Sequence, residues 1–176
     1  MTRAEKSLTA SALLLLVLSG SAQTRPDFSG HWIAVPDAAP GATNAAPAPP
    51  TFGSGLGTDI TITQNESTLT VERAQFSQYD IQPAMKFVYA IDGSDSRNAI
   101  NMGRGPQETT SKVAWQDGGL QLTTTYRSED RDGKPTTSEV RQLFTLESGD
   151  TLVISATRGG PPGGLPATSR QVYKKK

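Results

Sequence analysis

The chain has 176 residues, with no cysteine, a single histidine, and 17 basic side chains against 17 acidic ones. The lack of cysteine excludes disulfide bonds, thiolate metal sites and cysteine nucleophiles, and one histidine excludes any site that needs two. The formal net charge of zero argues against a nucleic-acid partner, because proteins that bind nucleic acids carry an excess of basic side chains.

The first 22 residues have the pattern of a secretory signal peptide. Arg3 and Lys6 give a basic start, the stretch 10–18 is apolar, and Ala22 is a small residue placed for cleavage. The apolar stretch is shorter than the roughly 20 residues that a membrane-spanning helix needs. We therefore expect residues 1–22 to form a signal helix that is removed. Residues 23–176 would then be one exported domain, periplasmic or secreted, without an integral membrane segment.

Short runs in which apolar and polar residues alternate make up most of residues 23–176. Turn dipeptides such as Asp117-Gly118 and Asp132-Gly133 separate several of these runs, and Asp-Gly is a strong signal for a β-hairpin. The alternation predicts strands at residues 31–35, 60–64, 68–73, 85–91, 98–102, 112–115, 120–127, 136–146, 151–157 and 168–174.

The connections between most of these strands are short, so neighbours in sequence should pair antiparallel. The prediction is an all-β, up-and-down meander of about 8–10 strands, closed or nearly closed into a barrel, because closure removes exposed sheet edges. An open, strongly curved sheet or a sandwich is the alternative.

Two segments break the alternating pattern. Residues 36–57 are rich in Pro, Ala and Gly, which cannot supply a ladder of backbone hydrogen bonds, so we expect a long loop there. Residues 159–164 read Gly-Gly-Pro-Pro-Gly-Gly and are typical of a flexible connector.

The first predicted strand opens with Asp27-Phe28-Ser29-Gly30-His31-Trp32. Its Gly30-x-Trp32 resembles the Gly-x-Trp of the lipocalin-like, or calycin, barrels. The resemblance implies that Trp32 closes one end of the barrel and that a basic residue of the last strand lies across its ring. Arg170 is the expected residue, with Lys174 as the substitute, and such a contact contributes about 0.5–2 kcal/mol.

The chain is also similar to small exported bacterial proteins that share the Asp-Phe-Ser-Gly-x-Trp start and a proline-rich loop. Trp115-Gln116-Asp117-Gly118-Gly119-Leu120 and Gln171-Val172-Tyr173-Lys174 match their later turn and terminal strand. This resemblance covers nearly all of residues 23–176, and it implies no particular activity.

Polar residues that interrupt apolar faces mark a candidate lumen. A polar side chain inside a barrel needs a partner, which a ligand or a trapped water can provide. The candidate ligand-binding residues are these polar positions together with nearby aromatic residues: Gln64, Arg73, Phe87, Tyr89, Trp115, Tyr126 and Gln142. The alternative is that the polar residues lie at the rim and the aromatic residues are packed core.

Candidate catalytic residues are few. His31 lies on the strand face opposite Trp32 and should be at the surface, and Glu72 and Glu139 fit solvated strand positions. We expect no catalytic residue, no metal and no cofactor.

The leading hypothesis is an exported, monomeric barrel that binds a small apolar or amphipathic ligand. A filled barrel that acts as a structural or protein-interaction module is the alternative. A hydrolase or isomerase using strand carboxylates is the third hypothesis. Filling of the lumen would separate the first two hypotheses, and it depends on Ile62, Leu69, Phe87, Leu122 and Phe144.

Overall fold

The computed structural model describes residues 25–36, 54–76, 81–101, 106–116, 118–129, 132–159 and 165–176. The expected signal helix lies outside the described residues, as do residues 37–53 and 160–164 of the two expected loops.

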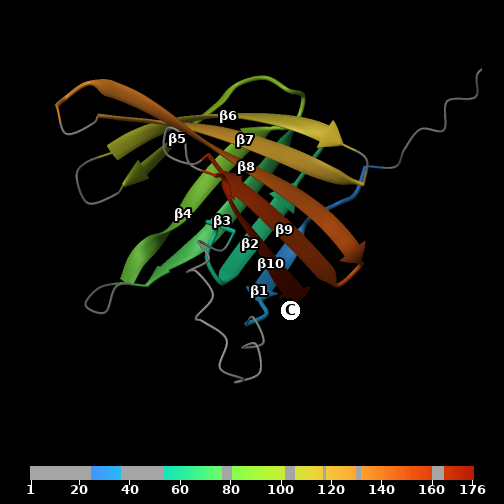
Figure 1. Ribbon diagram of the computed structural model, residues 1–176. Helices are drawn as coiled ribbons and strands as arrows, with labels where there is room; N and C mark the ends of the chain where they lie inside the picture. The colour runs from blue at the N-terminus through green and yellow to red at the C-terminus, as the bar shows by residue number, and fades with distance from the viewer. Residues whose placement is uncertain are drawn as a thin grey trace, which may run out of the picture.

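The described part of the chain is all-β, as the alternating pattern predicts (Figure 1). In that part no helix is long and apolar enough to span a membrane. The ten strands are β1 (Gly30–Ala34), β2 (Asp59–Gln64), β3 (Thr68–Phe76), β4 (Ile81–Ala90), β5 (Ser96–Asn101), β6 (Pro106–Gln116), β7 (Gly119–Glu129), β8 (Pro135–Ser148), β9 (Thr151–Arg158) and β10 (Ala167–Lys175).

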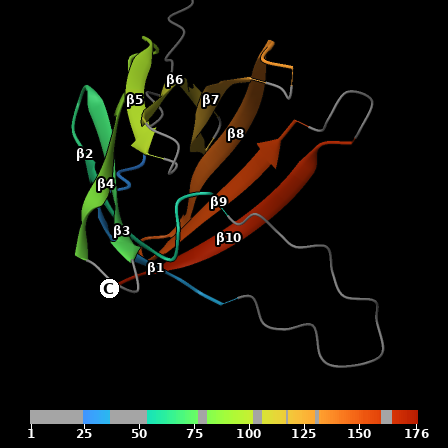
Figure 2. The same cartoon turned by 90° about the vertical axis from the view of Figure 1, so that its left-hand side faces the viewer.

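The strands form one sheet in the order β4-β3-β2-β1-β10-β9-β8-β7-β6-β5, and every pair in it is antiparallel. All pairs except β1 with β10 are neighbours in sequence, so the predicted up-and-down meander is confirmed. Pairing of β1 with β10 places the first and last strands in the middle of the sheet. The sheet curls until its two end strands, β4 and β5, lie side by side (Figures 1 and 2).

Side chains of β5 bridge the remaining seam between β4 and β5. Asn98 Oδ1 accepts a hydrogen bond from the Val88 amide (2.8 Å), and Asn98 Nδ2 donates one to the Val88 carbonyl (3.1 Å). Ser96 Oγ accepts a hydrogen bond from the Ala90 amide (2.7 Å). The Asn98 amide therefore takes the place of a backbone peptide opposite Val88, and edge groups of β4 gain partners. The result is a nearly closed barrel.

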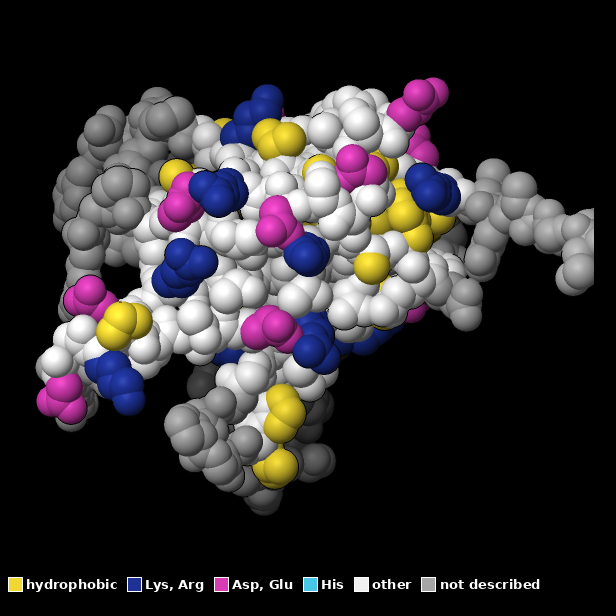
Figure 3. All heavy atoms as spheres, turned by 90° about the horizontal axis from the view of Figure 1, so that it is seen from above, with side chains coloured by type: hydrophobic (Ala, Val, Ile, Leu, Met, Phe, Trp, Pro, Cys, Tyr) yellow, Lys and Arg dark blue, Asp and Glu magenta, His cyan; other side chains and the backbone are white. Residues whose placement is uncertain are grey.

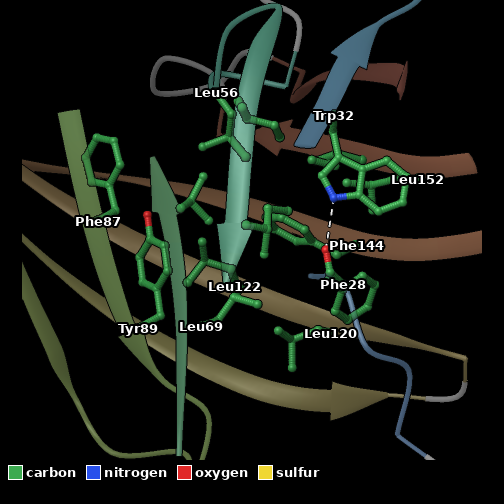
Figure 4. Packing of buried hydrophobic residues seen from close by; sticks show 14 of the residues in the cluster. Phe28, Trp32, Leu56, Leu69, Phe87, Tyr89, Leu120, Leu122, Phe144 and Leu152 are labelled. Carbon is green, nitrogen blue, oxygen red and sulfur yellow. Dashed lines mark hydrogen bonds between the residues drawn. The ribbon is translucent and has the colours of Figure 1, made fainter. Parts of the chain in front are cut away.

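Large apolar side chains form one buried cluster inside the barrel (Figure 4). The part of this cluster around Phe28, Trp32, Leu120 and Phe144 is called the filled end. The ring of Phe28 packs edge-on against Phe144, with centroids 6.1 Å apart, and stacks on Trp115 at 6.4 Å. Trp32 is fully buried, and its Nε1 donates a hydrogen bond to the Phe28 carbonyl (2.9 Å). Because the indole N–H has a partner, burying the large ring costs no unsatisfied polar group.

The cation above Trp32 belongs to Lys175, and the expectation for Arg170 is wrong. Lys175 pairs with Trp32 across β1 and β10, and its Nζ lies 5.3 Å from the centroid of the Trp32 rings. Residues 169, 171, 173 and 175 share the inward side of β10 because strand residues alternate. Arg170 therefore points outward, where it donates a hydrogen bond to Glu147 (2.6 Å).

The substitute, Lys174, also points outward and contacts Thr151 and Asp150.

Gly30 makes room for this lysine. A Cβ at Gly30 would lie 2.6 Å from Lys175 Cε, and the residue has a φ of +154°, which L side chains rarely adopt. The Gly30-x-Trp32 spacing therefore has a local cause, since the backbone at Gly30 has a φ that favours glycine and a Cβ there would press on the end of the Lys175 side chain.

The outer surface carries charges of both signs. Ion pairs on outward positions include Lys86 with Glu72 (3.2 Å), Arg141 with Glu139 (2.7 Å), and Lys112 with Asp95 (3.4 Å). Figure 3 shows one face on which basic and acidic side chains are interspersed. Exposed pairs of this kind stabilise a fold by only about 0–1 kcal/mol each.

Candidate ligand cavity

A cavity of about 550 Å³ occupies the end of the barrel opposite the filled end. It lies among inward-facing residues of β3 to β9 and a turn at residues 54–56. The lining residues are Ser54, Gly55, Leu56, Arg73, Phe87, Tyr89, Ile100, Gln107, Thr124, Tyr126, Ser128, Ser138, Val140, Gln142 and Arg158.

The cavity exists because the inward side chains change character along each strand. On β7 the inward residues Leu120 and Leu122 are fully buried in the core, and Thr124, Tyr126 and Ser128 follow them at the cavity. Thr124 and Ser128 are smaller than leucine, and all three polar side chains favour contact with water or a ligand over tight packing. The lumen is therefore filled at one end and hollow at the other.

The hydroxyl groups beneath the cavity are hydrogen-bonded to one another or to the backbone. Ser111 and Thr124 share a hydrogen bond of 2.9 Å, and Thr109 donates one to the Asn98 carbonyl (3.1 Å). All three side chains are buried. These bonds satisfy polar groups whose burial without a partner would destabilise the fold.

A short turn at residues 54–57 forms one wall of the cavity. Tyr173 donates its hydroxyl proton to the Gly57 carbonyl (2.7 Å), so the hydrogen bond between Tyr173 and Ser54 has Ser54 as its donor. Gln142 donates to the Ser54 carbonyl, and Leu56 is buried in the core. The turn is thus held by β8, β10 and the apolar core.

Two aromatic rings from β4, labelled in Figure 4, form another part of the cavity wall. Phe87 and Tyr89 lie on the same face of the strand, with ring centroids 6.4 Å apart and planes 8° from parallel. Burial raises the pKa of Tyr89 well above its ordinary value. Its phenol therefore stays protonated near neutral pH.

Arg73 connects the aromatic wall to the turn. Its guanidinium donates to Met85 Sδ (2.9 and 3.3 Å) and to the Gly55 carbonyl (3.3 Å), and its Cζ lies 5.7 Å from the Phe87 ring centroid. Within the described part of the chain these partners are a thioether, a carbonyl and a ring, so they leave its positive charge uncompensated.

Five of the seven predicted lumen residues line this cavity: Arg73, Phe87, Tyr89, Tyr126 and Gln142. They were predictable because inward positions share one parity along each strand. The sequence did not predict the other lining residues, which are Ser54, Gly55, Leu56, Ile100, Gln107, Thr124, Ser128, Ser138, Val140 and Arg158. For Arg158 a signal existed, since it continues the inward series Leu152, Ile154, Ala156.

The structure places Gln64 and Trp115 away from this cavity, at the filled end. They border a second hollow, of about 330 Å³. Gln64 Oε1 accepts a hydrogen bond from the Phe28 amide (3.1 Å), and Gln64 Nε2 donates one to the Pro26 carbonyl (3.0 Å). The Cζ of Arg25 lies 5.1 Å from the Trp115 ring centroid. Both residues therefore hold the segment before β1 against the barrel end.

The remaining candidates for chemistry lie on the outer face. His31 forms a 2.7 Å contact with Asp59, and both side chains are more than a third exposed. Glu72 and Glu139 form the ion pairs with Lys86 and Arg141 described above. None of these residues faces the cavity. In the described part of the chain no group of three or more acidic or His side chains could hold a metal ion.

Comparison with known proteins adds no family to this description: no protein-family model matches the chain, and no curated protein is similar to it at a significant level.

Proposed function

We propose that this protein is an exported, lipocalin-like barrel that binds a small apolar or amphipathic molecule in the cavity between the residue 54–57 turn and β4. The observation that carries the proposal is the hollow half of the lumen. Its volume of about 550 Å³ lies within the range of about 300–1,000 Å³ that is typical of small-molecule sites. Its wall combines apolar rings with hydroxyl and amide groups, which suits an amphipathic ligand.

The filled-barrel alternative has less support. Ile62, Leu69, Leu122 and Phe144 are buried and pack together, but they occupy the filled end. Phe87, the fifth residue on which filling depends, belongs to the same buried cluster and also lines the cavity. A barrel whose only role is to present its outer surface has no need of a hollow interior, whose lining loses packing contacts.

A cavity-filling variant tests ligand binding. Ser138 lines the cavity mouth and is exposed, so Ser138→Trp should place an indole in the cavity without disturbing the core. Thr137→Trp, on the neighbouring outward position of β8, is the matched control. We expect isothermal titration calorimetry to show binding of decanoate or 1-decanol to the wild type and to Thr137→Trp, with at least a tenfold weaker affinity for Ser138→Trp. If neither decanoate nor 1-decanol binds the wild type, or if both variants bind with equal affinity, the proposal is contradicted.

Export rests on the signal-peptide pattern of residues 1–22. Expression of the full chain in a Gram-negative host should give a mature protein in the periplasm or medium whose mass corresponds to cleavage after Ala22. Recovery of only full-length chain from the cytoplasm would contradict export without bearing on ligand binding.

A further inference from the structure

The charged residues that line the cavity are both arginines. Arg73 and Arg158 belong to the lining, and within the described residues that lining includes no Asp or Glu. The rest of the mouth consists of neutral hydroxyl and amide side chains, among them Tyr126, Ser128 and Ser138. The charged side chains of this lining are therefore both basic, although the whole chain has a formal net charge of zero.

The two arginines occupy equivalent places on their strands. On β3 the inward series Leu69, Val71 ends in Arg73. On β9 the inward series Leu152, Ile154, Ala156 ends in Arg158. Alternation directs both side chains to the interior at the hollow end of the barrel. The guanidinium groups therefore lie at the cavity mouth, half-buried for Arg73 and exposed for Arg158, where they can attract an anionic group.

Tyr126 lies within electrostatic reach of both arginines. Burial raises the pKa of its phenol, and the positive charges of Arg158 and Arg73 lower it in part. The phenol remains protonated near neutral pH, so it can donate a hydrogen bond to an acceptor at the mouth.

We propose that the ligand is an amphiphile with an anionic head group, which binds at the cavity mouth between Arg73, Arg158 and Tyr126. Its apolar part extends toward Phe87, Ile100 and Val140. Carboxylate and sulfate heads share the needed chemistry, because a guanidinium can donate two parallel hydrogen bonds to either. Both arginines already have contacts in the free protein. An anion is therefore favoured because both charged side chains of the lining are basic. This inference rests on the proposed ligand-binding function.

Four amphiphiles with different head groups separate ligand binding from the preference for an anionic head group. Decanoate, decyl sulfate, 1-decanol and decylammonium each contain ten carbons, and their head groups are anionic, anionic, neutral and cationic near neutral pH. By calorimetry we expect both anions to bind at least tenfold more tightly than 1-decanol, and decylammonium to bind most weakly. The ratio of the decanoate and decyl sulfate affinities then shows which anion the mouth prefers.

Arginine variants test the site itself. Arg73→Gln and Arg158→Gln should each weaken decanoate binding about tenfold, since a charge-assisted hydrogen bond is lost, and should leave 1-decanol binding unchanged. Arg170→Gln, on the outward face of β10, is the control and should change neither. Circular dichroism of each variant checks that it has folded. Arg158 is exposed, so we expect Arg158→Gln to fold and to test the site even if Arg73→Gln does not fold.

The outcomes are distinguishable. Equal affinity for the anionic, neutral and cationic amphiphiles, or an equal loss of decanoate and 1-decanol binding in the arginine variants, would overturn the head-group inference while ligand binding stands. Failure of all four amphiphiles to bind would overturn ligand binding and the head-group inference together.

Discussion

Trp32 shows how a single residue connects the sequence pattern to the packing of the barrel. Its ring is buried, its N–H has the Phe28 carbonyl as a partner, and Lys175 covers it from β10. Gly30 leaves space for that lysine. One indole therefore connects the segment before β1, the first strand and the last strand.

Removal of the indole should be costly. Trp32→Ala should lower the free energy of unfolding by about 3–5 kcal/mol, because it removes apolar contacts and leaves a cavity in the core. Urea unfolding followed by circular dichroism measures the change. Val35→Ala, at an exposed position just after β1, is the control and should have little effect. A loss of less than about 1 kcal/mol for Trp32→Ala would mean that the ring does not close a packed core.

The closing cation was mispredicted because its identity depends on register. The resemblance indicates only that a basic residue of the last strand covers the tryptophan, and β10 carries Arg170, Lys174 and Lys175. The pairing of Trp32 with Lys175 decides among them, and a shift of one residue would exchange the inward and outward sets.

The element scale is where sequence reasoning succeeds best. Each of the ten strands overlaps a predicted range, because the period-two alternation and the Asp-Gly turns are local signals. The strand ends were less accurate: β6 begins at Pro106, six residues before the predicted start. Its first part, Pro-Gln-Glu-Thr-Thr-Ser, has polar residues on both faces, since its inward positions belong to the polar half of the lumen.

Residues outside the strands were harder to predict. The turn at residues 54–57 belongs to a segment rich in Pro, Ala and Gly that has no periodicity, so nothing local indicates that Leu56 is buried or that Ser54 contacts Tyr173. Gln64 and Trp115 were assigned to the lumen from their strand faces. The face of a strand does not specify which end of the barrel is hollow, because that depends on how the inward series of all the strands align.

The seam between β4 and β5 depends on the Asn98 side chain. Asn98→Ala should leave the Val88 amide and carbonyl without their partners and reduce stability by about 1–3 kcal/mol. Hydrogen exchange of the Val88 amide should accelerate more than that of Leu120 in the core. Arg97→Ala, at the adjacent exposed position of β5, is the control. Unchanged exchange at Val88 in Asn98→Ala would show that the seam is not held by this side chain.

At the scale of the whole molecule, the barrel combines a filled end that stabilises it with a hollow end that is available for binding. The whole chain has a formal net charge of zero, and the two charged side chains of the cavity lining are both arginines. Stability and binding therefore depend on different inward residues of the same strands. Variants at the mouth should weaken binding with little effect on folding, and variants at the filled end should do the reverse.

Buried phenols make the fold sensitive to alkaline pH. Burial raises the pKa of Tyr89, Tyr126 and Tyr173 above the ordinary value of 10.0. Their contribution to stability is fully present below pH 10 and is lost as the pH rises through the folded-state values, because the unfolded chain releases these protons more readily. Urea unfolding at increasing pH should show stability falling above about pH 10, and Tyr89→Phe should make that fall shallower. Titration of all three phenols at their ordinary pKa in the folded protein, followed by absorbance at 295 nm, would contradict the burial described here.

The most direct test of the central claim, that the hollow half of the barrel binds a ligand, is a map of backbone amide shifts in heteronuclear NMR spectra during titration with decanoate. The account predicts saturable shifts at cavity-lining positions such as Tyr89, Thr124 and Gln142, with little change at Gln64 and Trp115. Shifts confined to the filled end or to the outer face, or no saturable shift at all, would contradict it.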